Sequence, residues 1–159
     1  LKLALDYEID FAVASHPIHD ERLEVRELFE EELLLALPPA HPLARRRKLD
    51  AGDLERERLI VMREGHCLGD QVLRFCERRA VTPGISFRSA QLETIQSLVR
   101  AGLGISLVPA MAARADKGEG LVYRPLPAPK PARKIVAFWP KQRPLSRGAT
   151  EFLKRIAIP

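Results

Sequence analysis

Cysteine, histidine and long apolar runs are scarce in this 159-residue sequence, and each scarcity excludes a class of protein. The 4 histidines are scattered and the cysteines number only 2, so we expect no metal site. Two cysteines also do not make the disulfide scaffold of a small secreted protein. No apolar run reaches the roughly 18 residues that span a bilayer, and the first residues lack the long apolar stretch of a signal peptide. These absences predict a soluble, cytoplasmic protein without membrane contact.

Motifs for catalysis and for nucleic-acid binding are also missing. The sequence has no Ser-His-Asp arrangement, no glycine-rich phosphate loop, no helix-turn-helix segment and no zinc-finger spacing. The net charge is +5, from 26 Lys+Arg against 21 Asp+Glu, and its one dense basic run, Arg45-Arg46-Arg47-Lys48, contains no aromatic residue for base stacking. Because this run follows Pro38-Pro39 and His41-Pro42, we interpret it as a solvated loop, with a direct phosphate contact as the alternative. We therefore expect neither enzyme activity nor a cofactor.

Segments with strand and helix character alternate along the chain. Hydrophobic residues make up 46% and charged residues 30%, which is enough apolar material for a packed core. Short apolar runs between turn residues predict strands, and apolar residues at helical spacing predict helices. The alternation predicts an α/β protein with mostly parallel strand pairing. The predicted strands are 10–14, 23–28, 32–37, 59–62, 85–88, 105–109, 121–123 and 134–139, and the predicted helices are 49–54, 68 to the break at Pro83-Gly84, 92–99, 110–114 and 148–156.

The clearest local pattern lies in the middle of the chain. The amphipathic segment Leu92–Val99 is followed by Ala101-Gly102-Leu103-Gly104, where glycine accepts the left-handed geometry of a helix end, and then by the apolar run Ile105–Pro109. This helix, glycine turn and strand resemble the signature of the effector domains of LysR-type transcription regulators. Glu8–Val13 is similar to that family's early strand, and His41-Pro42-Leu43 to its loop after the second-lobe strand. The resemblance covers essentially the whole chain.

This resemblance implies a fold like that of the type 2 periplasmic binding proteins, with two α/β lobes joined by two crossover strands and a cleft between them. Residues 31–133 would form the second lobe, and residues 1–30 and 134–159 would belong to the first lobe. Family members begin this domain with a strand, a helix and a further strand upstream of Leu1, and they carry an N-terminal winged helix-turn-helix that is absent here. We therefore expect an incomplete first lobe and a fragment of a longer product. The resemblance also implies a homodimer, a tetramer at full length, and DNA contact only through the missing domain.

The two cysteines lie in one predicted helix. Cys67 stands where the helix should begin, beside His66, and a thiolate is favoured by a helix N-terminus and a nearby cation. Cys76 follows nine residues later. Nine residues of helix rise about 13–14 Å, whereas a disulfide needs Cα atoms within about 7 Å, so an intact helix forbids the bond and pairing requires the segment to unwind. The alternatives are that Cys76 is a small buried hydrophobe and that Cys67 lines a ligand cleft without redox chemistry.

The segment Gly65–Gln71, with Cys76 downstream, is similar to the redox segment of the OxyR-type peroxide sensors in this family. The resemblance implies that Cys67 reacts with hydrogen peroxide and that Cys76 resolves the product to a disulfide. One position departs from the pattern, because Gly69 stands where the peroxide sensors typically have arginine. The departure removes one cation near the reactive sulfur.

Three further residues complete the site that the resemblance implies. His66, Asp70 and Arg133 would bind peroxide or another effector together with Cys67. From the residues alone, Asp70 is equally a first-turn helix charge, and Arg133 is equally a solvated residue after Pro131.

Three functions remain open at this stage. The first is a regulator domain that senses hydrogen peroxide through a Cys67–Cys76 thiol/disulfide switch. The second is a LysR-type effector domain that binds a small anionic metabolite in the cleft without redox chemistry, through amide donors at the helix starts near Cys67 and Leu92. The third is an enzyme or solute-binding protein on the same scaffold, for which the sequence has no motif.

Overall fold

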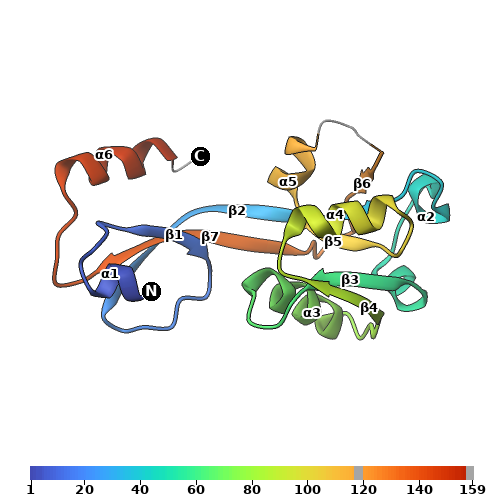
Figure 1. Cartoon of the computed structure of the whole chain (residues 1–159), viewed down its shortest axis with the longest axis horizontal. Helices are drawn as coiled ribbons and strands as arrows, with labels where there is room; N and C mark the ends of the chain where they lie inside the picture. The colour runs from blue at the N-terminus through green and yellow to red at the C-terminus, as the bar shows by residue number, and fades with distance from the viewer. Residues whose placement is uncertain (117–119, 157–159) are drawn as a thin grey trace. The chain divides into compact units, whose positions relative to one another are not determined.

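The computed structural model describes residues 1–116 and 120–156, and in it the chain divides into two compact units (Figure 1). Unit 1 contains Leu1–Glu31 and the chain from Arg133 onward, and unit 2 contains Glu32–Ala132. Two long strands, β2 (Leu23–Leu37) and β7 (Ala132–Pro140), carry the chain out of unit 1 and back into it. None of the helices within the described residues is long and apolar enough to cross a membrane.

Unit 1 is a small sheet with an apolar cluster on each face. Strand β7 lies between β1 (Ala12–Ser15) and β2, and β1 pairs with β7 antiparallel. Because side chains alternate along a strand, Ile135 and Ala137 face one cluster, which includes Leu153, while Phe138 faces the other, which includes Ala4. Leu153 belongs to helix α6 (Arg147–Ile156), and Ala4 to the short helix α1 (Lys2–Leu5).

Unit 2 holds the larger core. The second part of β2 pairs antiparallel with β5 (Ser106–Pro109) and with β6 (Val122–Arg124). Strand β3 (Arg58–Met62) pairs parallel with the exposed edge strand β4 (Gly84–Ser89).

Helices α3 (Cys67–Arg78) and α4 (Leu92–Arg100) both pack against β3 (Figure 1). This packing explains why four consecutive residues of β3 are buried, namely Leu59, Ile60, Val61 and Met62. The shorter helices of this unit are α2 (Pro42–Arg45), the 3-10 helix η1 (Ala51–Arg56) and α5 (Ala110–Ala115).

Two predictions about the strands were wrong. Residues 23–28 and 32–37 form one continuous strand of 15 residues, because no glycine or proline interrupts them and the buried Glu31 extends the inward-facing set of Leu33 and Leu35 toward the first segment. Pairing is also not mostly parallel. The pairs β1–β7, β2–β5 and β2–β6 are antiparallel, and among the described residues only β3–β4 and a single bridge from Leu59 to Ile105 are parallel.

The predicted helices exist with changed bounds. Helix α3 ends at Arg78, before the expected break at Pro83-Gly84, because Ala80 adopts a left-handed φ of 52°. The amide groups of Ala80 and Val81 donate back to the carbonyls of Glu77 and Cys76 at 3.0 and 2.9 Å, which is a Schellman helix end. The glycine expected to end α4 behaves as predicted, since Gly102 has a φ of 77°.

Candidate functional site

The predicted reactive cysteine is the first residue of α3. After β3 ends at Met62, the chain turns at Gly65, whose φ is +78°, and His66 becomes the N-cap of the helix. The Leu68 backbone N–H donates to Nδ1 of His66 at 3.3 Å. Cys67 is exposed, as expected for an oxidant-accessible thiol. The sequence Gly-His-Cys therefore folds into a capped helix start that presents one thiol.

The second cysteine faces the core from the same helix. Cys76 is 2% exposed and belongs to the apolar cluster of unit 2 together with Leu68 and Val72. Burial raises the pKa of the Cys76 thiol. Both thiols are free, and because α3 runs unbroken from Cys67 to Arg78, the rise between the two cysteines is about 13–14 Å. The reduced fold thus keeps an exposed thiol and a protected thiol apart on one helix.

Gly69 explains how the first turn of α3 is packed. It is buried against the end of β3, and a Cβ at this position would lie 2.7 Å from the Met62 carbonyl oxygen and 3.3 Å from the Met62 carbonyl carbon. A larger side chain here requires the helix or the strand to shift. A glycine at position 69, where the peroxide sensors typically have arginine, therefore allows the α3 backbone to pack closely on the end of β3.

The structure brings together three of the predicted site residues. His66, Cys67 and Asp70 share the start of α3, where Asp70 is the acidic residue of the first turn. A carboxylate in this turn is favoured by the positive end of the helix dipole, which agrees with the simpler interpretation of Asp70.

Arg133 belongs to unit 1, where it forms an ion pair. Its Nε donates to Oε2 of Glu31 at 2.8 Å and its Nη2 lies 2.7 Å from the same oxygen. The side chains are 18% and 4% exposed, so Arg133 is not a solvated residue. Glu31 was not among the predicted residues. The sequence did contain a signal for it, namely an acidic residue at an inward-facing position of a strand.

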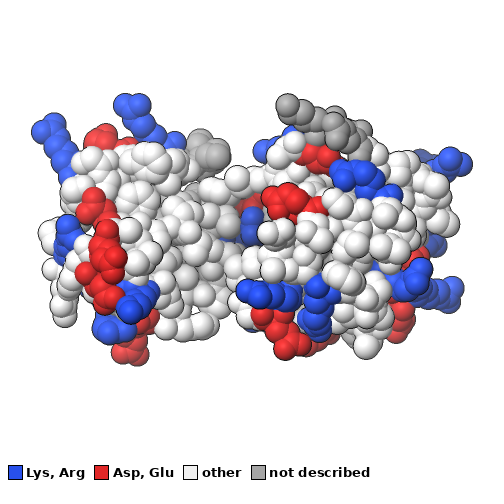
Figure 2. Space-filling view, in the orientation of Figure 1, with Lys and Arg blue, Asp and Glu red and all other residues white. Residues whose placement is uncertain are grey.

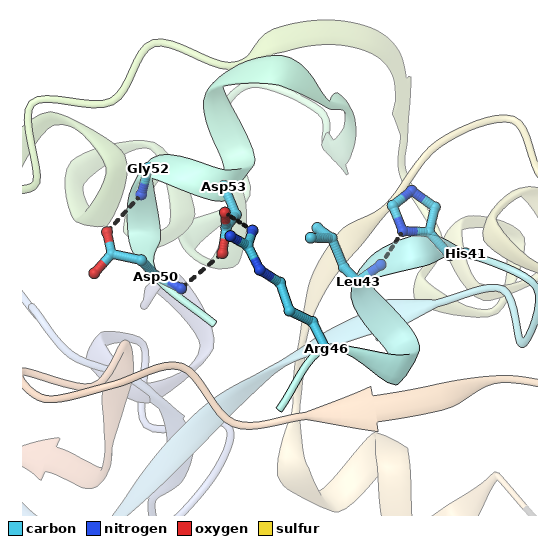
Figure 3. A network of polar contacts seen from close by, with 6 residues as sticks. All are labelled: His41, Leu43, Arg46, Asp50, Gly52 and Asp53. Atoms are coloured by element: carbon cyan, nitrogen blue, oxygen red, sulfur yellow. Dashed lines mark hydrogen bonds and ion pairs between the residues drawn. The ribbon is translucent and has the colours of Figure 1, made fainter. Parts of the chain in front are cut away.

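A second group of polar contacts surrounds the basic run (Figure 3). Arg46 is paired with Asp53, and Asp53 also accepts from the Asp50 backbone N–H at 2.8 Å. The Asp50 side chain accepts from Gly52 N–H at 3.0 Å, so Asp50 and Asp53 form a capping box around η1. The Arg46 guanidinium is therefore already paired with a carboxylate of unit 2.

The rest of the basic run is exposed, but only part of it is a loop: Arg45 is the last residue of α2, and Arg47 and Lys48 lie in the segment that follows. Figure 2 shows that Lys and Arg side chains alternate with Asp and Glu on the visible face, without one continuous basic surface. In residues 1–116 and 120–156, His, Cys, Asp and Glu side chains form no group of three or more suited to a metal ion.

Comparisons with known proteins agree with these features. The family model of the LysR substrate binding domain matches residues 1–157. The chain is 41% identical over 109 residues to the DNA-binding transcriptional dual regulator OxyR of Escherichia coli (strain K12), covering 68% of this chain and 36% of that protein. It is 35% identical over 147 residues to the hydrogen peroxide-inducible genes activator of Pectobacterium carotovorum subsp. carotovorum, covering 92% of this chain and 48% of that protein. The chain therefore spans about half or less of the length of these relatives.

Solved structures show the same similarity. The reduced form of the OxyR regulatory domain from Pseudomonas aeruginosa superimposes with a TM-score of 0.84 at 28% identity, covering 98% of this chain and 75% of that one. The oxidized form of OxyR superimposes with a TM-score of 0.79 at 31% identity, covering 98% and 74%. The predicted α/β, two-lobe fold of the periplasmic-binding-protein type is confirmed. The chain belongs to the LysR substrate binding domain family.

Proposed function

We propose that this chain is the regulatory domain of a DNA-binding LysR-type transcription regulator and senses hydrogen peroxide through Cys67 and Cys76. The observation that carries the proposal is the pair of free thiols on α3, one exposed at the helix start and one buried nine residues later. The relatives named for OxyR and for hydrogen peroxide-inducible activation support it. DNA binding would reside in a part of the longer protein outside this chain, and the role is regulatory rather than enzymatic.

The chemistry needs only these two thiols and peroxide. The Cys67 thiolate attacks one peroxide oxygen, the O–O bond breaks, and the leaving hydroxide takes a proton and becomes water, which leaves a sulfenic acid on Cys67. The Cys76 thiolate then attacks the Cys67 sulfur, the S–O bond breaks, and the second oxygen also leaves as water. Two thiols and one peroxide become one disulfide and two waters. The helix start favours the first step, because its N–H groups and dipole stabilise a thiolate.

The second step requires a change of fold. Cys76 is buried and its thiol pKa is raised, so it cannot attack while the reduced core is intact. The end of α3 near Cys76 is held by the Schellman contacts and by buried Val81, whereas the start contains Gly69 and follows Gly65. Glycine lowers helix stability by about 1 kcal/mol relative to alanine, so we expect unwinding to begin at the Cys67 end. The remodelled segment would transmit the oxidation of the two cysteines to the rest of the regulator.

The proposed assembly follows from the same family relation. We propose that unit 2, Glu32–Ala132, is the second effector lobe and that unit 1 belongs to the first lobe. The lobe bounds expected from the sequence, 31–133 for the second lobe and 1–30 with 134–159 for the first, differ from these units by one residue at each crossing. The peroxide site would comprise His66, Cys67 and Asp70, which share the start of α3. The chain would form a homodimer, and a tetramer at full length, in the cytoplasm.

Stoichiometric peroxide followed by thiol counting and mass spectrometry tests the proposal. The wild-type chain should lose two thiols and yield a crosslinked peptide that contains Cys67 and Cys76. The Cys76→Ser variant should stop at a sulfenic acid on Cys67 that a dimedone-type probe traps, and the Cys67→Ser variant should retain its remaining thiol. Peroxide sensing would be contradicted if the cysteines of the wild type did not react, or if the Cys67→Ser variant consumed as much peroxide as the wild type.

An anionic metabolite remains the second candidate, because one observation favours it. Gln91, the N-cap of α4, forms no side-chain capping hydrogen bond, so the first-turn N–H groups of this helix are available to a carboxylate or phosphate. The double variant Cys67→Ser/Cys76→Ser separates the two functions. If an anion shifts the melting temperature of that variant as much as that of the wild type, while peroxide oxidises neither cysteine in the wild type, the metabolite function replaces peroxide sensing.

A further inference from the structure

His66 is held at the start of α3 by both its backbone and its ring. Its carbonyl oxygen accepts from Gly69 N–H at 2.8 Å and from Asp70 N–H at 3.3 Å, while its ring Nδ1 accepts from Leu68 N–H at 3.3 Å. An imidazole nitrogen can accept a hydrogen bond only when it carries no proton. In this geometry the ring is therefore neutral, with its proton on Nε2.

This role differs from the one that the sequence suggested. A histidine beside a reactive cysteine is readily taken as the cation that stabilises the thiolate. An imidazolium, however, has two donors and no acceptor, so protonation would break the bond from Leu68. It would also place a positive charge at the positive end of the helix dipole. Both effects loosen the first turn of the helix that carries Cys67.

We propose that His66 is a positioning residue that acts as a neutral N-cap: through the Leu68 N–H···Nδ1 bond it holds the first turn of α3, and with it the Cys67 thiol, in helical geometry. The consequence for peroxide rests on the proposed function, whereas the cap itself does not. Because this turn carries Cys67 and is the part of α3 that must unwind for disulfide formation, the cap opposes that unwinding.

The charged groups near this turn do not replace the cap. Asp70 lies in the first helical turn, and Arg63 and Glu64 are exposed in the preceding turn, where the Arg63 carbonyl accepts from His66 N–H at 3.2 Å. The Glu64 side chain points to Arg88 at a distance of 3.8 Å. Within residues 1–116 and 120–156, no side chain forms a hydrogen bond or ion pair with Nε2 of His66.

The same chain contains a matched reference. His41 is the N-cap of α2, and its Nδ1 accepts from Leu43 N–H at 3.2 Å (Figure 3). Its Nε2 lies 3.2 Å from Oε2 of Glu57, so the carboxylate selects the tautomer with the proton on Nε2. Two histidines thus cap helices of unit 2 in the same way, one with a carboxylate behind the ring and one without.

Three substitutions in a Cys76→Ser background test the proposal. His66→Asn keeps an acceptor at the cap and cannot titrate, His66→Phe keeps a ring without an acceptor, and His66→Lys supplies a cation without an acceptor. The readouts are hydrogen exchange of the Leu68 amide and the rate of Cys67 alkylation by iodoacetamide, both measured at the same neutral pH. Neither readout needs peroxide chemistry, so a failure of peroxide sensing leaves this test intact.

We expect His66→Asn to retain both the protection of the Leu68 amide and the alkylation rate of Cys67 within about threefold. His66→Phe and His66→Lys should lower Leu68 protection by about fivefold, which corresponds to the loss of one N-cap. His41→Asn is the matched control and should change neither readout. The proposal is wrong if His66→Lys reacts with iodoacetamide at least as fast as the wild type. It is also wrong if His66→Asn loses as much Leu68 amide protection as His66→Phe, because the capping acceptor would then not be what positions Cys67.

Discussion

The ion pair between Arg133 and Glu31 offers the sharpest test of how unit 1 is held together. Two contacts of 2.7 and 2.8 Å join the guanidinium to one carboxylate oxygen, and the side chains are only 18% and 4% exposed. Removing one partner from a buried ion pair costs about 3–5 kcal/mol, whereas an exposed pair contributes roughly 0–1 kcal/mol. Because Arg133 keeps some solvent contact, we expect Arg133→Met to lower the free energy of unfolding by about 2–4 kcal/mol.

The double variant identifies the cause of this loss. Arg133→Met/Glu31→Leu replaces both charges with apolar side chains of similar size, and we expect its free energy of unfolding to lie within about 1–2 kcal/mol of the wild type. The neighbouring Lys134→Met is the control, because its pair with Glu27 is 49% and 50% exposed and should contribute less than about 1 kcal/mol.

Urea unfolding monitored by fluorescence measures all four proteins. The single tryptophan, Trp139, packs against the apolar cluster of unit 1 that contains Leu153, so its fluorescence reports on that unit. If Arg133→Met costs no more than Lys134→Met, or if the double variant is as unstable as the single one, the pair does not stabilise unit 1.

Three further predictions address local features. Gly69→Ala should lower the free energy of unfolding by roughly 1–3 kcal/mol in urea titrations, because its Cβ would meet the Met62 carbonyl oxygen at 2.7 Å, and a neutral result would show that the helix shifts freely. Asp50→Ala should cost about 1 kcal/mol through loss of the N-cap of η1, while Asp50→Ser should cost much less; equal losses would exclude capping as the cause. Burial raises the pKa of Tyr123 to about 12, so absorbance titration of a Tyr7→Phe variant should show its remaining phenol ionising near that pH. Because the folded state favours the neutral Tyr123 phenol, the stabilisation from this group is complete below about pH 10 and is lost as the pH rises toward 12. A titration midpoint near pH 10 would contradict the burial of this phenol.

Sequence periodicity was sufficient for the elements whose environment is local. The apolar spacing of Leu92–Val99 and the glycine at position 102 predicted α4 and its end, and the run Leu59–Met62 predicted a strand buried on both faces. The start of α3 at Cys67 also followed from a local signal, because apolar positions at helical spacing begin at Leu68.

Strand continuity and direction could not be obtained in this way. Residues 29–31 contain no break, but only pairing with distant strands makes β2 one strand of 15 residues, and only the return of the chain makes β5 and β6 antiparallel to it. The end of α3 is a similar case. Ala80 has no intrinsic preference for the left-handed region, so burial of Val81 and the Schellman bonds decide that α3 ends at Arg78.

By itself, the sequence determined the α/β class, the positions of most helices and strands, and the placement of two thiols nine residues apart in one helix. Only the tertiary structure decided that Glu31 is the partner of Arg133 and that Gly69 packs on the β3 backbone. The physical reason is the range of the interactions. Helix periodicity and capping act within a few residues, whereas ion pairing across strands and close backbone approach depend on atoms that the fold brings together.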